Sequence, residues 1–201
     1  MVGLVINDSD ADPGRITRCG SLGEYRTRLL MLADPDTVDV LEQVGPIAWQ
    51  DRKGKTHSHF LDHVAIKRDG RRLGFTDKPY RRVRPDFEYE ISQVCAEAKR
   101  RGIIDELYLV TEYARDPIDL HNADLMRGCR DDEPEVDEIA LDVILNMTAP
   151  RTMRDLVREI DRGPRGFRAL VRRLHSGQLK QIKKEKITLD TSVVTGGFGD
   201  E

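Results

Sequence analysis

The chain has 201 residues, of which 34% are charged and 38% hydrophobic, and its formal net charge is -3. This apolar fraction is enough for a core, which excludes wholesale disorder, and no run approaches the roughly 18 apolar residues of a membrane-spanning helix. Residues 1–13 lack the basic start and apolar stretch of a secretion signal. The three cysteines form neither a CxxC pair nor a disulfide framework, so we expect a reducing, cytoplasmic location and no structural zinc.

Charge is distributed unevenly along the chain. Residues 151–201 hold 12 Lys/Arg and 7 Asp/Glu, a net charge of +5, which leaves -8 for residues 1–150. An acidic body with a basic C-terminal quarter indicates two modules, the second of which meets a polyanion or an acidic partner.

The first elements follow from a cap and from strand periodicity. Residues 1–20 are expected to form an irregular leader. Ser21 and Glu24 have the spacing of a capping box, which begins an amphipathic helix that runs to about Ala33. Alternating apolar residues then predict strands, the last two of which pair as a hairpin around Asp69-Gly70. These strands are expected at residues 37–43, 47–50, 59–67 and 72–78.

A second helix and a compact strand follow the hairpin. Pro85 opens a helical pattern that Gly102 ends. The apolar run at 107–111 predicts a strand buried on both faces, and a further helix is expected at 117–126. An acidic, proline-containing linker at 130–135 marks the expected domain boundary.

The remaining residues have a pattern of three helices and two short strands. Helical patterns cover residues 136–147, the segment that Thr152 caps with Asp155 at N3, and residues 166–175. Weak alternation over 178–194 then predicts a hairpin. Three helices followed by a β-hairpin are typical of a winged helix. We therefore expect domains at residues 21–130 and 136–194 and a flexible tail at 195–201.

Three residues fall in an order that suits metal-dependent phosphodiester cleavage. Glu24 begins the first helix, and Asp62 and Lys78 lie on the two strands of the hairpin. Carboxylates can hold Mg²⁺, and a cation can stabilise the charge of the scissile phosphate. Side chains alternate between strand faces, so Thr76 and Lys78 share a face, and Asp62 and Lys78 can reach a common edge. Each residue taken alone also has a structural explanation without catalysis. Glu24 would complete the capping box, Asp62 would be a surface acid at a strand edge, and Lys78 would be a solvated surface residue.

The similarity to a known family is carried by short motifs in a fixed order. These motifs lie at residues 21–24, 32–38, 42–43, 59–62, 69–70, 78–79, 109–112, 122–125, 147–150 and 174–179. In order and spacing they resemble the TnsA-type endonuclease subunit of heteromeric transposases, over residues 20–194.

The resemblance implies an α/β fold, a restriction-endonuclease-like mixed sheet flanked by helices, followed by a small winged-helix domain. It implies a DNA endonuclease that depends on Mg²⁺, or on Mn²⁺, and cuts double-stranded DNA at the ends of a mobile element. Glu24 and Asp62 would hold the metal, and Lys78 would polarise water or phosphate. The implied partners are a DDE-type transposase subunit and an AAA+ ATPase regulator.

The sequence departs from this family at the aspartate position. Many nucleases of this class have Pro-Asp-Phe there, whereas His59 precedes Phe60 in this chain. We prefer Asp62 because the family also contains a His-x-x-Asp form, and because the 16-residue step from Asp62 to Lys78 suits a hairpin. His57, His59 and His63 alternate along one strand, but without a further ligand at matching spacing they do not predict a zinc site.

The position two residues before the lysine also departs from the family. Thr76 replaces the usual Glu or Gln, and Asp77 is expected to point to the other face of the strand. Thr76 and His59 would then shape the site rather than hold metal. The alternative function is a catalytically weak or inactive subunit that keeps the fold for DNA binding and transposase assembly. A stand-alone winged-helix regulator is disfavoured, because it leaves residues 20–130 without a role.

A set of basic residues is expected to contact DNA phosphates. Four surround the predicted hairpin, three lie opposite the apolar stripe of the third C-terminal helix, and two stand where a wing would begin. They are Arg71, Arg72, Arg81, Arg82, Arg165, Arg168, Arg172, Lys180 and Lys183. Some winged helices bind only protein, so the partner of the C-terminal set stays open between DNA and protein.

Overall fold

The computed structural model describes residues 2–6 and 15–197. The chain divides into an N-terminal unit, residues 1–32 and 36–116, and a C-terminal unit, residues 33–35 and 117–201. Within the described ranges, no helix combines the length and apolar character needed to cross a membrane.

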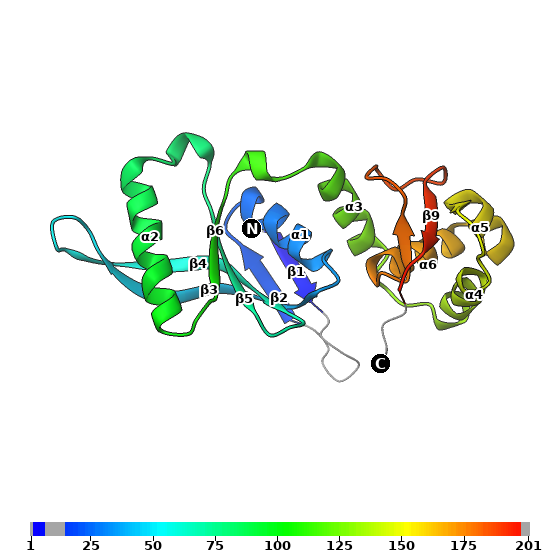
Figure 1. The fold of residues 1–201 in the computed structure, drawn as a ribbon, viewed down its shortest axis with the longest axis horizontal. Coiled ribbons are helices and arrows are strands. Elements are labelled where there is room, and N and C mark those ends of the chain that lie inside the picture. The colour runs from blue at the N-terminus through cyan, green and yellow to red at the C-terminus, as the bar shows by residue number, and fades with distance from the viewer. Residues whose placement is uncertain (1, 7–14, 198–201) are drawn as a thin grey trace. The chain divides into compact units, whose positions relative to one another are not determined.

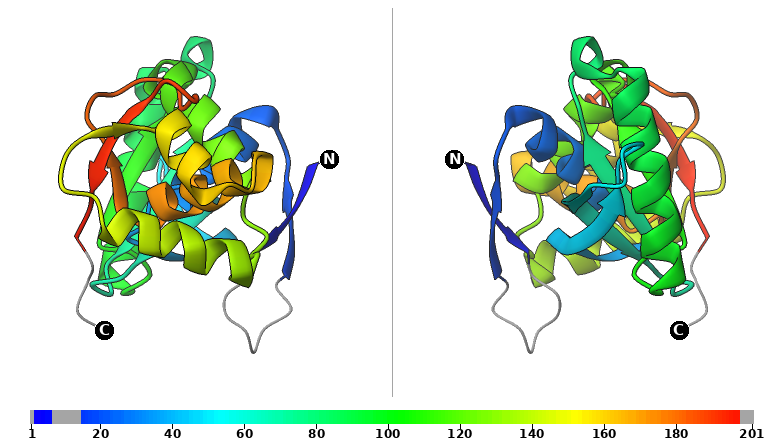
Figure 2. Two further views of the ribbon diagram at one scale, coloured as in Figure 1. Left: turned by 90° about the vertical axis from the view of Figure 1, so that its right-hand side faces the viewer. Right: turned by 90° about the vertical axis from the view of Figure 1, so that its left-hand side faces the viewer.

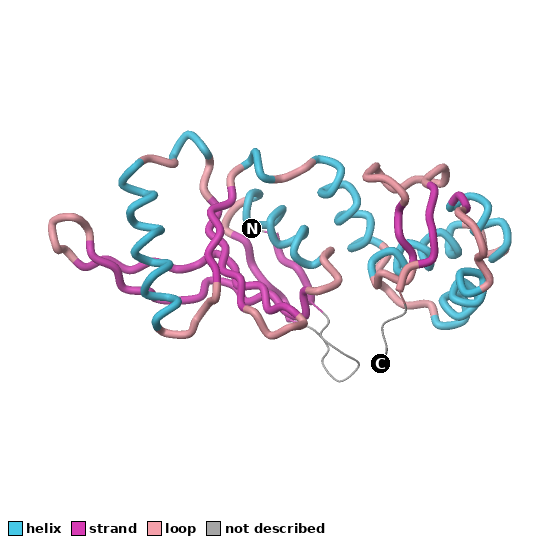
Figure 3. The backbone as a smooth tube through the Cα atoms, in the orientation of Figure 1, coloured by secondary structure: helices cyan, strands magenta, loops and turns pink. Residues whose placement is uncertain are grey.

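The N-terminal unit is built on a mixed four-stranded sheet with the order β3-β4-β5-β6. Its strands are β3 (Thr37–Gln50), β4 (Thr56–Lys67), β5 (Arg72–Asp77) and β6 (Glu106–Val110). β4 is antiparallel to both β3 and β5, and β6 is parallel to β5. β5 pairs with β4 only up to His63, so the outer parts of β3 and β4 continue as a two-stranded ribbon (Figure 3).

Two helices flank this sheet. Helix α1 (Leu22–Leu32) and helix α2 (Pro85–Arg100) lie on either side of it (Figure 1). The core under α1 is formed by Met31, Val40 and Ala65. The core under α2 is formed by Ile47, Leu61, Val64, Val94, Ala98 and Ile104. The expected α/β class and the mixed sheet flanked by helices are therefore confirmed.

The expected irregular leader is wrong for the described part of residues 1–20. Strands β1 (Val2–Ile6) and β2 (Arg15–Cys19) pair as an antiparallel ribbon, seen side by side in Figure 2. The apolar, β-branched sequence of the first strand favours this conformation once β2 supplies hydrogen-bond partners. Residues 7–14, and 198–201 of the expected tail, lie outside the described residues.

Two strand predictions also need correction. The separate strands expected at 37–43 and 47–50 are one strand, β3, with a register shift against β4 between Val44 and Ile47. The strand expected to be buried on both faces, β6, is an edge strand, and its Tyr108 is 42% exposed. An edge strand has one neighbour only, so its apolar residues are covered less completely than a central strand's.

The C-terminal unit combines four helices with a small antiparallel sheet. The helices are α3 (Pro117–Gly128), α4 (Pro134–Leu145), α5 (Met153–Ile160) and α6 (Pro164–His175). The sheet has the order β7-β9-β8, with β7 (Arg151–Thr152), β8 (Leu179–Gln181) and β9 (Ser192–Thr195). The expected three helices and two strands are confirmed, and β7 is an addition. Thr152 caps α5 as expected, because its hydroxyl accepts the Asp155 N–H at 3.2 Å.

The division between the units lies between Asp116 and Pro117 rather than in the 130–135 linker. Helix α3 belongs to the C-terminal unit because the buried Asn122 ties it there. The Asn122 side chain accepts the Ile187 N–H and donates to the Glu185 carbonyl, both at 2.9 Å. The acidic 130–135 segment, whose last two residues begin α4, therefore lies within the C-terminal unit.

Candidate functional site

Three carboxylates from three elements interact on the α1 side of the sheet. Glu24 lies in the first turn of α1, Asp62 lies on β4, and Asp77 ends β5, just before Pro79 prevents further strand pairing. The negative charge of Glu24 acts on both aspartates and raises the pKa of each. We call Glu24, Asp62 and Asp77 the carboxylate cluster.

The capping box places Glu24. The Ser21 hydroxyl accepts the Glu24 N–H at 3.1 Å, and Glu24 Oε2 accepts the Gly20 N–H at 2.7 Å. This reciprocal pair is the arrangement that the Ser-x-x-Glu spacing predicts. One carboxylate oxygen thus fixes the helix start, and Oε1 lies outside the cap.

Asp62 is held by the strand beside it. Its Oδ2 accepts the backbone N–H of Asp77 at 2.7 Å, and Gln43 Nε2 approaches its Oδ1 at 3.5 Å. Burial raises the pKa of Asp62 to about 6, aided by the charges of Glu24 and Asp77, although the Asp77 N–H acts in the opposite direction. Asp62 is therefore an acid whose charged form is destabilised by its surroundings.

Asp77 is the most enclosed member of the cluster. Its side chain is 6% exposed, and its Oδ1 accepts the Thr27 hydroxyl at 2.7 Å and pairs with the Arg115 guanidinium. Its other oxygen, Oδ2, is buried and has no hydrogen-bond partner among the described residues. Burial raises the pKa of Asp77, while Thr27 and Arg115 partly offset that rise. A buried carboxylate oxygen without a partner is costly, unless a ligand supplies one.

Sequence reasoning missed Asp77 and Arg115. It placed Asp77 on the opposite face from Thr76, which is correct, but Asp62 lies with Asp77 on the α1 side. Arg115 carries no local signal, because it lies 38 residues from its partner Asp77.

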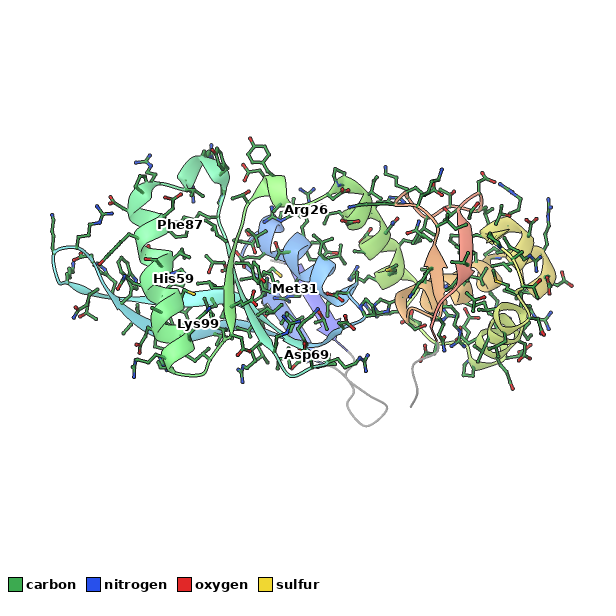
Figure 4. The ribbon with its side chains drawn as sticks, viewed as in Figure 1. Arg26, Met31, His59, Asp69, Phe87 and Lys99 are labelled. Carbon is green, nitrogen blue, oxygen red and sulfur yellow. The ribbon has the colours of Figure 1, made fainter. Side chains whose placement is uncertain are left out.

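Lys78 contacts helix α2. Its ammonium lies 4.2 Å from the ring centroid of Phe87, on α2. Thr76 also faces α2, where its hydroxyl lies 3.2 Å from His59 Nε2. Figure 4 shows His59 and Phe87 alongside α2. Thr76 and Lys78 therefore share one face of the strand, as the alternation predicts. His59 connects this face to the carboxylate cluster, because its charge acts on Asp62 and opposes the rise in the pKa of that carboxyl.

His59 links two elements through both ring nitrogens. Its Nδ1 lies 2.9 Å from Glu90 Oε1 and its Nε2 contacts Thr76. A carboxylate, a histidine and a hydroxyl in this order resemble a nucleophile-activating relay. Thr76 is only 3% exposed, however, which puts its hydroxyl out of reach of a substrate. These hydrogen bonds of His59 therefore hold β4, β5 and α2 together.

The side chains that could coordinate a metal ion here are carboxylates and histidines. The described ranges contain no group of three or more His, Cys, Asp or Glu side chains that could hold a metal. His57 instead bonds Asp51, and His63 bonds the Glu24 carbonyl. Mg²⁺ needs less than such a cage, because it keeps several waters and is bound through one or two carboxylates and substrate phosphates. The three carboxylates of the cluster are not such a group, but two of them can offer the hard oxygens that Mg²⁺ takes.

The basic residues expected to bind DNA divide into exposed and paired groups. In the N-terminal unit Arg81 and Arg82 are exposed, Arg71 pairs with Asp69, and Arg72 is partly buried. In the C-terminal unit, Lys180 is exposed and Lys183 pairs with Glu185.

Three arginines of α6 are paired with acidic residues at the start of α4. Arg165 and Arg168 both lie by Glu133, which precedes α4, and Arg172, whose side chain is 10% exposed, pairs with Asp137 in its first turn at 2.8 Å. The expected open DNA-binding face is therefore wrong for Arg172, because periodicity alone could not show that the start of α4 covers it.

Replacing Asp62 with asparagine should stabilise the protein at neutral pH. The native pKa of about 6 exceeds the ordinary 3.8, so the native state holds its proton more tightly than the unfolded chain. This contribution is complete below pH 3.8 and is lost as the pH rises through 6. The difference corresponds to at most roughly 3 kcal/mol at neutral pH, and solvent screening reduces it.

Urea unfolding from pH 4 to 8, without divalent metal, checks this result. Wild type should lose stability relative to Asp62→Asn as the pH rises, and Asp124→Asn, at an exposed position, should follow the wild type. Parallel pH profiles for wild type and Asp62→Asn would contradict the assigned environment.

Comparisons with known proteins add no family assignment: no protein-family model matches the chain, and a search of curated protein sequences finds no match.

Proposed function

We propose that the N-terminal unit is a metal-dependent DNA endonuclease domain with its reactive centre at the carboxylate cluster. The observation that carries the proposal is that Glu24, Asp62 and Asp77 converge electrostatically from three elements, with Asp77 Oδ2 buried and unpartnered. The mixed sheet with a helix on each face is compatible with a restriction-endonuclease-like fold. The motif order that resembles TnsA-type subunits points to the same chemistry.

Each member of the cluster has a distinct role in this proposal. Asp62 and Glu24 would hold Mg²⁺ or Mn²⁺, which when bound polarises a phosphate oxygen and lowers the pKa of its water. Asp77 Oδ2 is buried without a hydrogen-bond partner, and Arg115 and Thr27 fix its other oxygen. The Asp77 N–H orients Asp62. The residues thus pre-arrange negative oxygen atoms, which is the protein's part in metal-assisted hydrolysis.

The position of Lys78 favours a second candidate, a nuclease-fold subunit without activity. Its ammonium lies over Phe87 on the α2 side, and Thr76 there provides no carboxylate. Such a subunit would keep the fold for DNA binding and transposase assembly.

We further propose that the C-terminal unit is a winged-helix module. The order α4-β7-α5-α6-β8-β9 and the antiparallel arrangement β7-β9-β8 support this. The α6 arginines are paired with Glu133 and Asp137, which favours a protein partner over DNA for that helix. A DDE-type transposase subunit and an AAA+ regulator are the partners that the resemblance suggests.

Nicking of supercoiled plasmid tests the two candidates. With Mg²⁺ or Mn²⁺, wild type should nick, and Asp62→Asn and Asp77→Asn should each reduce the rate on the order of 100-fold or more, since they remove site charge. Glu90→Gln, on the α2 side, is the matched control and should retain activity. Lys78→Ala should abolish nicking with DNA binding nearly intact if Lys78 assists the reaction, whereas a parallel loss of binding makes it a phosphate contact.

A readout independent of cleavage separates the candidates further. Titration with Mg²⁺ or Ca²⁺ should stabilise wild type against heat and stabilise Asp62→Asn much less. A wild type that neither binds these ions nor nicks, even with a DDE-type transposase subunit present, establishes the inactive subunit instead.

A further inference from the structure

Two exposed tyrosines meet where parallel strands end. The short helix η1 (Tyr80–Arg82) follows β5, and η2 (Glu112–Ala114) follows β6. Because β5 and β6 are parallel, both short helices lie at the same end of the sheet, where the two strands have their carboxyl ends. The Tyr80 N–H donates to Glu112 Oε2 at 2.8 Å, which ties the two segments together. Ligands of open α/β sheets bind at this kind of edge.

The aromatic rings of these segments face solvent. Tyr80 is 60% exposed and Tyr113 is 77% exposed, and their ring centroids lie 5.4 Å apart in an edge-to-face arrangement. These are the two highest exposures among the large apolar side chains of the described residues. Each ring is thus supported by the other, while most of its surface is left without a protein partner.

Two arginines and one glutamate lie beside the rings. Arg81 and Arg82 are exposed on η1, and the pKa of the Glu112 carboxyl is lowered chiefly by the Tyr80 N–H and also by the charge of Arg81. Arginines recognise phosphates, and aromatic faces stack on bases. The combination therefore matches a nucleic acid strand rather than an apolar protein surface.

The tyrosines are anchored to the carboxylate cluster. Tyr80 lies three residues after Asp77, Tyr113 lies two residues before Arg115, and Asp77 and Arg115 are paired with each other. A strand whose base stacks on either ring would therefore have its neighbouring phosphates close to the carboxylate cluster.

We propose that Tyr80 and Tyr113, with Arg81 and Arg82, form a stacking platform that receives unpaired bases of a DNA strand next to the scissile phosphate. This inference rests on the proposed endonuclease function and specifies its substrate as DNA with an unpaired segment beside the cut. Stacked bases inside an intact duplex have no free faces, so the platform selects frayed, flapped or single-stranded DNA.

Equilibrium binding without cleavage tests the platform. The probes are a fluorescent (dT)15 oligonucleotide, an abasic oligonucleotide of equal length and a blunt 15-bp duplex, with EDTA present. Wild type should bind (dT)15 more tightly than either of the others. The double variant Tyr80→Ala with Tyr113→Ala should bind (dT)15 about 10- to 100-fold more weakly, and the double phenylalanine variant should restore binding, because it keeps the rings.

Salt titration tests the arginines. Removing Arg81 and Arg82 together should flatten the log–log salt slope by about 1.4, at about 0.7 per phosphate contact on a single strand. Arg158→Ala, an exposed arginine of the C-terminal unit, and Phe60→Ala, an exposed aromatic of β4, are the matched controls and should bind as wild type does.

Several outcomes would overturn the platform: equal binding of (dT)15 and abasic DNA, no loss in the double alanine variant, or no rescue by phenylalanine. Failure of the endonuclease proposal is separable, because it is measured by nicking with Mg²⁺ or Mn²⁺, whereas the platform is measured by (dT)15 binding in EDTA. A protein that binds (dT)15 through the tyrosines and never nicks retains the platform and loses the nuclease.

Discussion

Arg172→Ala should destabilise the C-terminal unit by about 3–5 kcal/mol, as expected when one partner of a buried ion pair is removed. The Arg172 side chain is 10% exposed and the Asp137 side chain 14%, and Arg172 Nε lies 2.8 Å from Asp137 Oδ1. Its Nη1 also donates to the carbonyls of Cys129 and Asp131 at 2.9 Å. Alanine would leave a carboxylate enclosed without its cation and two carbonyls without their donor.

Arg168 provides the matched control on the same helix. Arg168 Nε lies 4.0 Å from Glu133, and its side chain is 37% exposed, so Arg168→Ala should cost less than about 1 kcal/mol. Denaturant unfolding of the full chain, followed by circular dichroism, measures both. Equal costs for the two substitutions would show that Arg172 is no more than a surface residue. Arg172→Lys should give an intermediate cost, because lysine keeps the charge but loses the planar fork.

Arg115→Ala should have an effect of similar size in the N-terminal unit, about 3–5 kcal/mol. Arg115 and Asp77 are 8% and 6% exposed, and Arg115 Nε also donates to the Thr27 hydroxyl at 3.1 Å. Without the guanidinium, the raised pKa of Asp77 would rise further, and its ionised form would be buried beside two other acids.

A double-mutant cycle isolates this pair. Asp77→Asn removes the charge that needs Arg115, so Arg115→Ala should cost much less in the Asp77→Asn background than in wild type. Arg100→Ala, which breaks an exposed pair with Glu97, is the control and should change stability by less than about 1 kcal/mol. Strictly additive costs for Arg115 and Asp77 would exclude direct coupling.

Local signals in the sequence predicted most elements correctly. The capping box at Ser21 and Glu24, the Asp69-Gly70 hairpin and the Pro85 helix start depend on residues a few positions apart, and the structure contains all three. The position of the domain boundary depends instead on Asn122 bonding residues more than 60 positions away, which no window of local sequence can detect.

The candidate site shows the same limit. Glu24 and Asp62 were found because their order suits a known chemistry, and the structure brings their charges into interaction. Lys78 was assigned to the same edge, but strand alternation turns it toward Phe87. Arg115 joins the site because it pairs with Asp77, which is distant in the sequence, and no local sequence pattern indicates that pairing.

The pairing of α6 with the acidic start of α4 affects the long-range electrostatic attraction between the C-terminal unit and other molecules. Residues 117–150 carry 2 Arg and 9 Asp/Glu, a net charge of -7, which more than cancels the +5 of residues 151–201. Residues 117–201 therefore have a net charge of -2, and the positive side chains of α6 stand beside their neutralising partners. Such a unit exerts little long-range attraction on a polyanion. Its rate of encounter with a polyanion would therefore change little with ionic strength.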